Sequence, residues 1–208
     1  MEFFDVVTTQ RAMRRLKQDP IPEAALRQIM DAAICAPSGG NRQGWRFVVV
    51  RDPAKRARLG ELYREGFSEL AKLPYYAGAM KEPPGSPTRK MVDSAAHLAE
   101  HMGEAPVIIV PCIALEPGVK PTIITGSSIY PAVQNIMLAA RALGIGSCLT
   151  TVHRYREAQV KELLGVPADV ETVALIPLGY PLGKFGRPPR RPLVEVVFAD
   201  GWGRAFQP

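Results

Sequence analysis

The chain has 208 residues, of which 47% are hydrophobic and 22% are charged, as in an ordinary globular protein with a sizeable core. No apolar run approaches the ~18 residues of a membrane-spanning helix, and the start, Glu2-Phe3-Phe4-Asp5, lacks the pattern of a signal peptide. The formal net charge of +6 fits either a nucleic-acid partner or an anionic cofactor.

The first half of the chain predicts three helices and one strand. Apolar residues at helical spacing over 22–36 predict a helix, and 46–50 reads as a buried strand. A charged helix is expected from Asp52 to about Leu73, and another over 88–101. Between them, residues 74–87 are rich in proline, glycine and tyrosine and predict a long mobile loop.

The second half predicts a sheet covered on both faces. Residues 106–113 are almost continuously apolar, as expected of a strand that is buried on both sides. The helix over 128–143 is apolar nearly all round, which predicts burial on most sides, and Gly144 ends it. The other expected elements are strands over 146–151 and 172–179 and a helix over 154–164.

The tail, residues 181–208, holds a Pro/Arg-rich turn and then a strand pattern over 193–198. Its apolar content is too low for independent folding, so it is expected to join a sheet of its own chain or of a partner. Neither a repeat nor a linker divides the sequence, which predicts one domain over 1–208.

Cysteine and histidine predict no metal site. Cys35, Cys112 and Cys148 lie in apolar surroundings without a Cys-x-x-Cys pair, so we expect buried thiols and a cytoplasmic protein. His97 and His101 lie four residues apart, but no third ligand stands near them.

The loop over 36–45 breaks its preceding helix with proline, serine and two glycines. Its free backbone N–H groups, beside the amides of Asn41 and Gln43, suit a flat ligand rich in ring nitrogen and oxygen. The alternative is a loop that caps its own backbone.

Basic residues gather in two groups, near each end of the chain. Two separated arginine groups suit one phosphate gripped from two sides, although solvated surface charges are the alternative. Neither interleaved aromatics nor a continuous basic helix face supports nucleic-acid binding. The groups are Arg11, Arg14, Arg15 and Lys17, and Arg187, Arg190 and Arg191.

Four segments in order (9–16, 36–47, 134–147 and 176–181 followed by 190–193) resemble the nitroreductase family of flavin enzymes, and the resemblance extends over about residues 5–198. It implies an α+β fold with a central, mostly antiparallel or mixed sheet flanked by helices. It also implies a homodimer with FMN at shared active sites and a C-terminal segment that extends onto the partner subunit.

The resemblance assigns the flavin phosphate and ring edge to arginines. Arg11 and Arg190 would contact the phosphate from two sides, and Arg14 would reach the ribityl chain and the N1/C2=O edge. The family usually has serine where this chain has Ala12 and often a basic residue at Gln10, so weaker FMN retention is expected.

Two further segments would line the ring. Pro37, Ser38 and Asn41 match the loop that covers the flavin, from the opposite subunit. Leu149, Thr150 and Thr151 match a segment whose backbone passes N5 and can donate a hydrogen bond there. For the two threonines the alternative is ordinary β-branched strand residues.

The implied function is hydride transfer from NAD(P)H through FMN to a nitroaromatic, a quinone or a related conjugated electrophile, in a ping-pong cycle. No nucleophile–base pair or paired carboxylates suggest themselves, and no Gly-x-Gly-x-x-Gly fingerprint occurs. The flavin would therefore carry the chemistry, with Arg14 and Thr150 as tuning residues and loop 74–87 as a lid that selects the small-molecule acceptor.

Three alternatives remain open at this point. One is a dehalogenase or flavin-fragmenting branch of the same fold, for which no substrate-gripping residues can be identified. Another is flavin binding or storage without turnover, and the third is nucleic-acid binding. The physiological acceptor and the preference between NADH and NADPH do not follow from the sequence.

Overall fold

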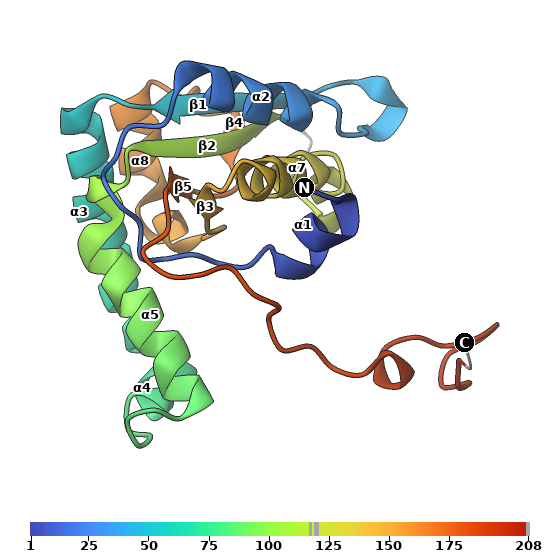
Figure 1. Cartoon of the computed structure of the whole chain (residues 1–208). Coiled ribbons are helices and arrows are strands. Elements are labelled where there is room, and N and C mark those ends of the chain that lie inside the picture. The colour runs from blue at the N-terminus through green and yellow to red at the C-terminus, as the bar shows by residue number, and fades with distance from the viewer. Residues whose placement is uncertain (117, 119–120, 207–208) are drawn as a thin grey trace.

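A computed structural model describes residues 1–116, 118 and 121–206. Within them the chain builds one five-stranded antiparallel sheet in the order β1-β2-β5-β3, with β4 beside β2 (Figure 1). Helices flank this sheet, so the predicted α+β architecture is confirmed. The strands are β1 (Trp45–Val50), β2 (Val107–Ala114), β3 (Gly146–Ser147), β4 (Val170–Thr172) and β5 (Ile176–Gly179).

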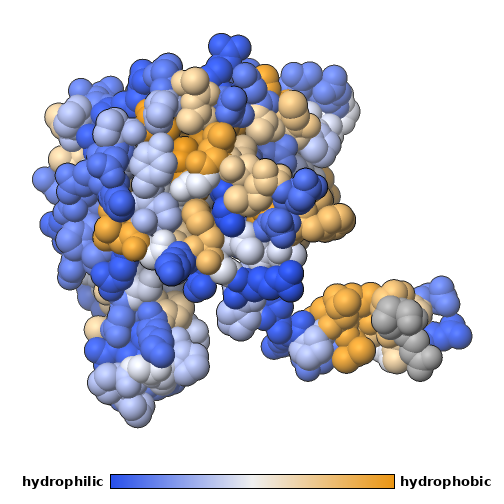
Figure 2. Space-filling view, viewed as in Figure 1, coloured by the Kyte–Doolittle hydropathy of each residue, from blue (hydrophilic) through white to orange (hydrophobic). Residues whose placement is uncertain are grey.

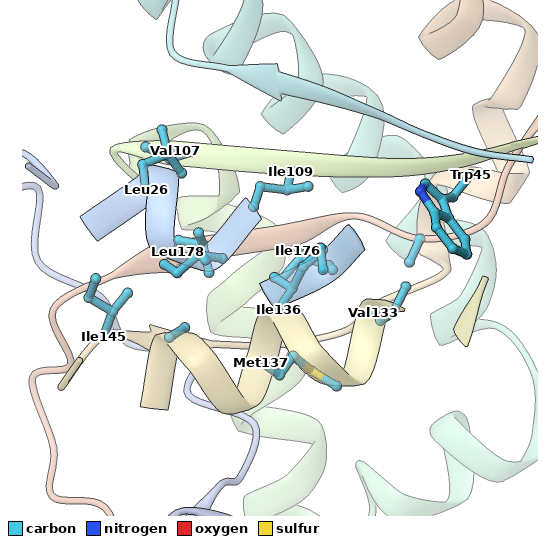
Figure 3. Packing of buried hydrophobic residues seen from close by; sticks show 14 of the residues in the cluster. Leu26, Trp45, Val107, Ile109, Val133, Ile136, Met137, Ile145, Ile176 and Leu178 are labelled. Carbon is cyan, nitrogen blue, oxygen red and sulfur yellow. The ribbon is translucent and has the colours of Figure 1, made fainter. Parts of the chain in front are cut away.

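Strand β2 is the centre of the fold because both of its faces are buried. Val107 and Ile109 point into a core formed with α2 (Glu23–Ile34) and α7 (Tyr130–Ala142), part of which Figure 3 shows. Ile108 and Val110 point into a second core formed with α3 (Pro53–Ala71), α5 (Pro87–His101) and α8 (Glu157–Leu164). Alternate side chains of a strand face opposite sides, so the continuous apolar run of β2 serves two cores at once.

Helix ends follow local chemistry. The Asp52 side chain accepts a hydrogen bond from the Lys55 N–H at 2.8 Å and starts α3, and Ser86 caps α5 through the Arg89 N–H at 3.1 Å. Gly144, with φ +74°, lies just after α7 and adopts the left-handed conformation that ends helices. Other short elements are α1 (Phe3–Thr9), α6 (Ile123–Gly126), η1 (Gly39–Asn41), η2 (Met102–Glu104) and η3 (Val152–Arg156).

The predicted loop over 74–87 was wrong in its first part. Residues Pro74–Ala79 form helix α4, and only the turn that follows it is irregular. Pro74 stands in the first turn, where its missing N–H is not needed, so this proline starts a helix rather than breaking one. Together α4 and the beginning of α5 project from the body of the molecule (Figure 1).

Two other predictions need correction. The strand over 172–179 is two strands, because residues 173–175 leave the β4 pairing before β5 pairs again with β2. The strand over 146–151 is only Gly146–Ser147, followed by an isolated bridge from Thr150 to Leu175. Helix α7 is buried or half-buried on most sides, as predicted, but Tyr130, Gln134 and Ala142 are exposed.

The strand predicted over 193–198 is also wrong. Leu193–Glu195 form a 3-10 turn, η4, because no strand of the described chain lies beside them to complete a ladder. The tail is fastened at its root, where the Leu182 N–H donates to the Arg15 carbonyl at 3.0 Å and Arg141 stacks 4.1 Å from the Phe185 ring centroid. Beyond this point the tail leaves the body and carries an apolar surface (Figures 1 and 2).

The thiols are buried only in part. Cys112 and Cys148 are buried as expected, but Cys35 is exposed because it lies at the end of α2. Among the described residues no cluster of three or more His, Cys, Asp or Glu could hold a metal ion. The described helices include none with the length and apolarity needed to cross a bilayer.

Candidate functional site

A cavity of about 490 Å³ opens between α3, α5 and the segment that follows β3. Its volume lies within the range of ordinary small-molecule sites. Apolar and aromatic side chains form most of its wall, and Arg14 and Arg154 are its cationic groups. The described residues that line it include no aspartate or glutamate; besides the two arginines they are Tyr63, Phe67, Leu70, Tyr76, Met91, Ala95, Cys148, Leu149, Thr150, Thr151, Val152 and Tyr155.

Arg14 reaches this cavity because its segment is bonded on both sides. The Met13 N–H donates to the Ser147 carbonyl at 2.8 Å, and Leu16 forms a bridge with Pro181. The close approach needs a glycine at 146, where a Cβ would lie 2.9 Å from the Met13 Cβ. The sequence-predicted Arg14 therefore stands beside the end of β3.

Leu149, Thr150 and Thr151 line the same cavity as Arg14. The family resemblance predicted that these four residues share one site. The Thr150 N–H donates to the Leu175 carbonyl at 3.1 Å, and the Leu175 N–H donates to the Thr150 carbonyl at 2.8 Å. The Thr151 N–H has no partner among the described residues. A backbone donor to a ligand in this segment is thus available at Thr151 and not at Thr150.

Tyr63 is a member of the site that the sequence analysis missed. It comes from α3, is only 2% exposed, and its hydroxyl lies 2.8 Å from the Thr150 Oγ1. Burial raises the pKa of Tyr63 to about 12, so the phenol stays protonated at neutral pH. The signal in the sequence was a tyrosine within the apolar stripe of α3, where a buried hydroxyl needs a partner.

Cys148 contributes bulk rather than reactivity. Burial raises the pKa of its thiol, although the neighbouring Arg14 acts in the opposite direction. The nucleophilic thiolate is therefore disfavoured at neutral pH. This agrees with the prediction of an inert buried thiol.

The loop with Pro37, Ser38 and Asn41 lies away from this cavity within one chain. Ser38 instead borders a second hollow of about 710 Å³, beside α6 and the end of β2. Its Oγ accepts from the Gln43 N–H at 3.0 Å, and the Gln43 side chain donates to Asn41 Oδ1 at 3.0 Å. Part of the loop thus hydrogen-bonds to itself, as in the alternative of a loop that caps its own backbone.

The other predicted residues also lie outside the cavity lining. Arg11 and Ala12 are exposed, and Gln10 contacts the Met137 sulfur at 3.7 Å. Arg190 lies on the exposed tail and donates to its neighbour, the Pro189 carbonyl, at 2.9 Å. Neither Arg11 nor Arg190 therefore lines the cavity in which Arg14 stands.

A buried histidine stands directly behind the lining segment. His153 is 0% exposed, and its Nε2 lies 3.2 Å from the Thr172 Oγ1, which in turn donates to Glu157 Oε1 at 2.9 Å. Since the threonine proton goes to Glu157, Nε2 carries the imidazole proton; Nδ1 finds no partner among the described residues. Burial is the main reason that the pKa of His153 falls to about 4.

Comparison with known proteins identifies the family. The family model described as "Nitroreductase family" matches residues 7–180. The chain belongs to the nitroreductase family. The arginine segment, loop 36–45, α7 and the sheet that supports the cavity all lie within the matched region.

Individual relatives agree with this assignment. The chain is 33% identical over 199 residues to a protein of Thermus thermophilus named NADH dehydrogenase, covering 90% of this chain and 91% of the relative. The structure resembles oxidised iodotyrosine deiodinase bound to FMN and 3-iodo-L-tyrosine, with a TM-score of 0.74 at 22% identity and coverage of 96% and 99%. It also resembles NADPH:FMN oxidoreductase of Vibrio harveyi complexed with NAD+, with a TM-score of 0.71 at 23% identity and coverage of 98% and 79%. At these identities the two structures show a shared fold alone.

Proposed function

We propose that the protein is an FMN-dependent oxidoreductase that passes a hydride from NAD(P)H to a small conjugated electrophile such as a quinone or a nitroaromatic. The observation that carries this proposal is one cavity that combines Arg14, the 149–151 segment and a largely apolar wall whose described residues include no carboxylate. Membership of the nitroreductase family supports the same reading.

The residues fit a flavin in their chemistry. The flat ring needs apolar walls, which α3 and α5 supply, and it needs donors at its nitrogen and oxygen edge. Arg14 and the free Thr151 N–H are donors of this kind. When bound, FMN supplies hydride acceptance and donation, which no side chain of the cavity can perform.

The chain's own part is binding and electrostatics. Arg14 places a positive charge in a cavity with no described carboxylate to neutralise it, which favours a bound group as it gains negative charge. Phe67 and Met91 exclude water from the wall, and a drier wall strengthens the effect of that charge. The protonated hydroxyl of Tyr63 adds a neutral polar group, 2.8 Å from the Thr150 Oγ1.

We further propose a homodimer in which Pro37, Ser38 and Asn41 of one subunit complete the other subunit's site, with Arg11 and Arg190 gripping the phosphate. All of these residues except the half-buried Ser38 are exposed, as is the apolar tail, and none of them lines the cavity of its own chain, which supports the proposal. Ala12 and Gln10, where the family usually has a serine and often a basic residue, would contribute less to phosphate binding.

Dehalogenation of an amino acid is the second candidate, because one structural relative is an iodotyrosine deiodinase. An amino-acid substrate carries an ammonium group that requires a carboxylate or carbonyl partner when it is buried. The described lining of the cavity holds no carboxylate, and although Arg154 is paired with Glu157 and Glu171, Arg14 adds a positive charge, which favours a neutral or anionic acceptor instead.

The purified protein provides the test. We expect a yellow preparation that releases FMN on denaturation, loses its colour with NADH or NADPH, and regains it with menadione. A yellow protein that resists both reductants would be a flavin store without turnover. A colourless protein that cannot be reconstituted with FMN would overturn the proposal.

A further inference from the structure

We propose that the hydroxyls of Tyr63 and Thr150 act as one hydrogen-bond donor, through which the cavity recognises an oxygen atom of its acceptor. This inference deepens the proposed function and rests on it. It concerns how the site chooses its ligand, and it assigns a role to the buried tyrosine of α3.

Burial and the acidity of the two hydroxyls give the pair a direction. Tyr63 is 2% exposed, whereas Thr150 is half-buried, and both line the cavity with their oxygens 2.8 Å apart. A phenol is a stronger donor than an aliphatic alcohol, so Tyr63 donates to Thr150. The more accessible Thr150 hydroxyl then keeps its own proton for a ligand.

The surroundings make this donor selective. The Thr150 backbone is fixed because both of its groups are bonded to Leu175, and its hydroxyl is held by the 2.8 Å hydrogen bond to Tyr63. The nearby walls from Phe67, Leu70 and Met91 offer no competing acceptor. A hydroxyl in an apolar wall is left unsatisfied by a ligand without an acceptor, and such sites discriminate strongly against the analogue that lacks it.

Coupling between the two hydroxyls strengthens the donor. A hydroxyl that accepts one hydrogen bond becomes a better donor in the next, and the effect is larger where the local dielectric constant is low. Tyr63 is therefore a positioning and polarising residue, and Thr150 is the group that touches the ligand. Oxygen-bearing acceptors, with a carbonyl or a nitro group, are the class that fits.

The test uses the oxidised FMN-loaded protein and two probes of similar shape, nitrobenzene and isopropylbenzene, with dissociation constants from calorimetric or absorbance titration. We expect the wild-type protein to prefer nitrobenzene at least tenfold. Thr150→Val should remove this preference, and Tyr63→Phe should reduce it about threefold or more. Because the two hydroxyls act as one unit, adding Tyr63→Phe to Thr150→Val should have no further effect.

Tyr180→Phe is the matched control, since this half-buried tyrosine packs against the other core and lies outside the cavity lining. It should leave the preference unchanged. The inference would be overturned if wild type and both variants showed the same preference for nitrobenzene. It would also be overturned if the variants changed the FMN midpoint potential without changing the nitrobenzene affinity. Either result would leave the proposed function intact. A protein that binds no FMN would overturn both.

Discussion

At the scale of the single residue, His153 links folding to pH. Its folded-state pKa of about 4 lies below the ordinary value of 6.5, because burial disfavours the imidazolium. Between these values the unfolded chain binds a proton that the folded chain does not, so the free energy of unfolding falls as pH is lowered through this window. The full effect amounts to about 3 kcal/mol, at roughly 1.4 kcal/mol for each unit.

Urea unfolding at pH 7.0, 5.5 and 4.5 measures this dependence. We expect His153→Gln to be less stable at pH 7 but to lose less stability on acidification than the wild-type protein. Parallel loss in both proteins would show that another group carries the acid sensitivity. The neighbours Glu157 and Arg154 remain in both proteins, so the comparison isolates the imidazole.

The residue scale also shows what a sequence can reveal about a site. Arg14 and Thr150 could be predicted to meet because each belongs to a segment with a recognisable pattern, and the structure places both at one cavity. Tyr63 could not, since it is 87 residues from its partner Thr150 and reads as part of an apolar helix stripe. For loop 36–45 the family resemblance predicts a place at the opposite subunit's site, and a single chain shows only that Ser38 borders a different hollow from Arg14.

At the scale of the element, the contact between α3 and the segment after β3 depends on Gly66. A Cβ at this position would lie 2.7 Å from the Val152 carbonyl oxygen, so Gly66→Ala must push the two backbones apart. We expect a loss of stability of about 1–3 kcal/mol, typical of overpacking, and weaker FMN binding because Thr151 moves with Val152.

Gly78→Ala in α4 is the control, since nothing lies within 4 Å of its added Cβ. There the higher helix propensity of alanine should leave stability equal or raise it by up to about 1 kcal/mol. Thermal unfolding and fluorescence titration with FMN measure both effects. If Gly66→Ala binds FMN as tightly as the wild-type protein, the contact between α3 and Val152 does not determine the shape of the cavity.

Helix α4 and the turn after it give the second prediction at this scale. Tyr76 of α4 lines the cavity and lies edge-on to Phe67 of α3, with ring centroids 6.5 Å apart. Replacing residues 74–85 with a short glycine-serine linker should keep FMN bound while changing the ratio of kcat/KM between a large and a small quinone by at least tenfold. Loss of FMN would instead make this segment part of the cofactor site and reject it as a selecting lid.

Elements with a clear local pattern were predicted well, and those inferred from composition or propensity alone were not. Helices α3 and α5 each combine a side-chain cap with a proline in the first turn, and β2 is apolar throughout. Residues 74–79 carry a composition typical of loops, although Pro74 only starts a helix there. The pattern over 193–198 shows strand propensity without a neighbouring strand, and propensity alone does not make a sheet.

At the scale of the whole molecule, the tail of a single chain exposes apolar side chains. Leu193, Val194 and Trp202 are each more than 60% exposed, which is costly in water unless another surface covers them. The root of the tail is nevertheless fixed by Phe185 against Arg141. A segment with a fixed root and an exposed apolar end is suited to pack on a second copy of the chain.

Two variants separate the tail's two proposed roles. Removing residues 187–208 should convert the dimer largely to monomer, because the apolar end is lost, and should weaken FMN binding. Arg190→Ala should leave the dimer intact but weaken FMN binding more than tenfold, since a charge-assisted contact to phosphate contributes about 1.5–3 kcal/mol. Light scattering after gel filtration and fluorescence titration measure the two effects. A truncated protein that remains dimeric would assign the interface to other surfaces, and an unchanged FMN dissociation constant in Arg190→Ala would place the phosphate elsewhere.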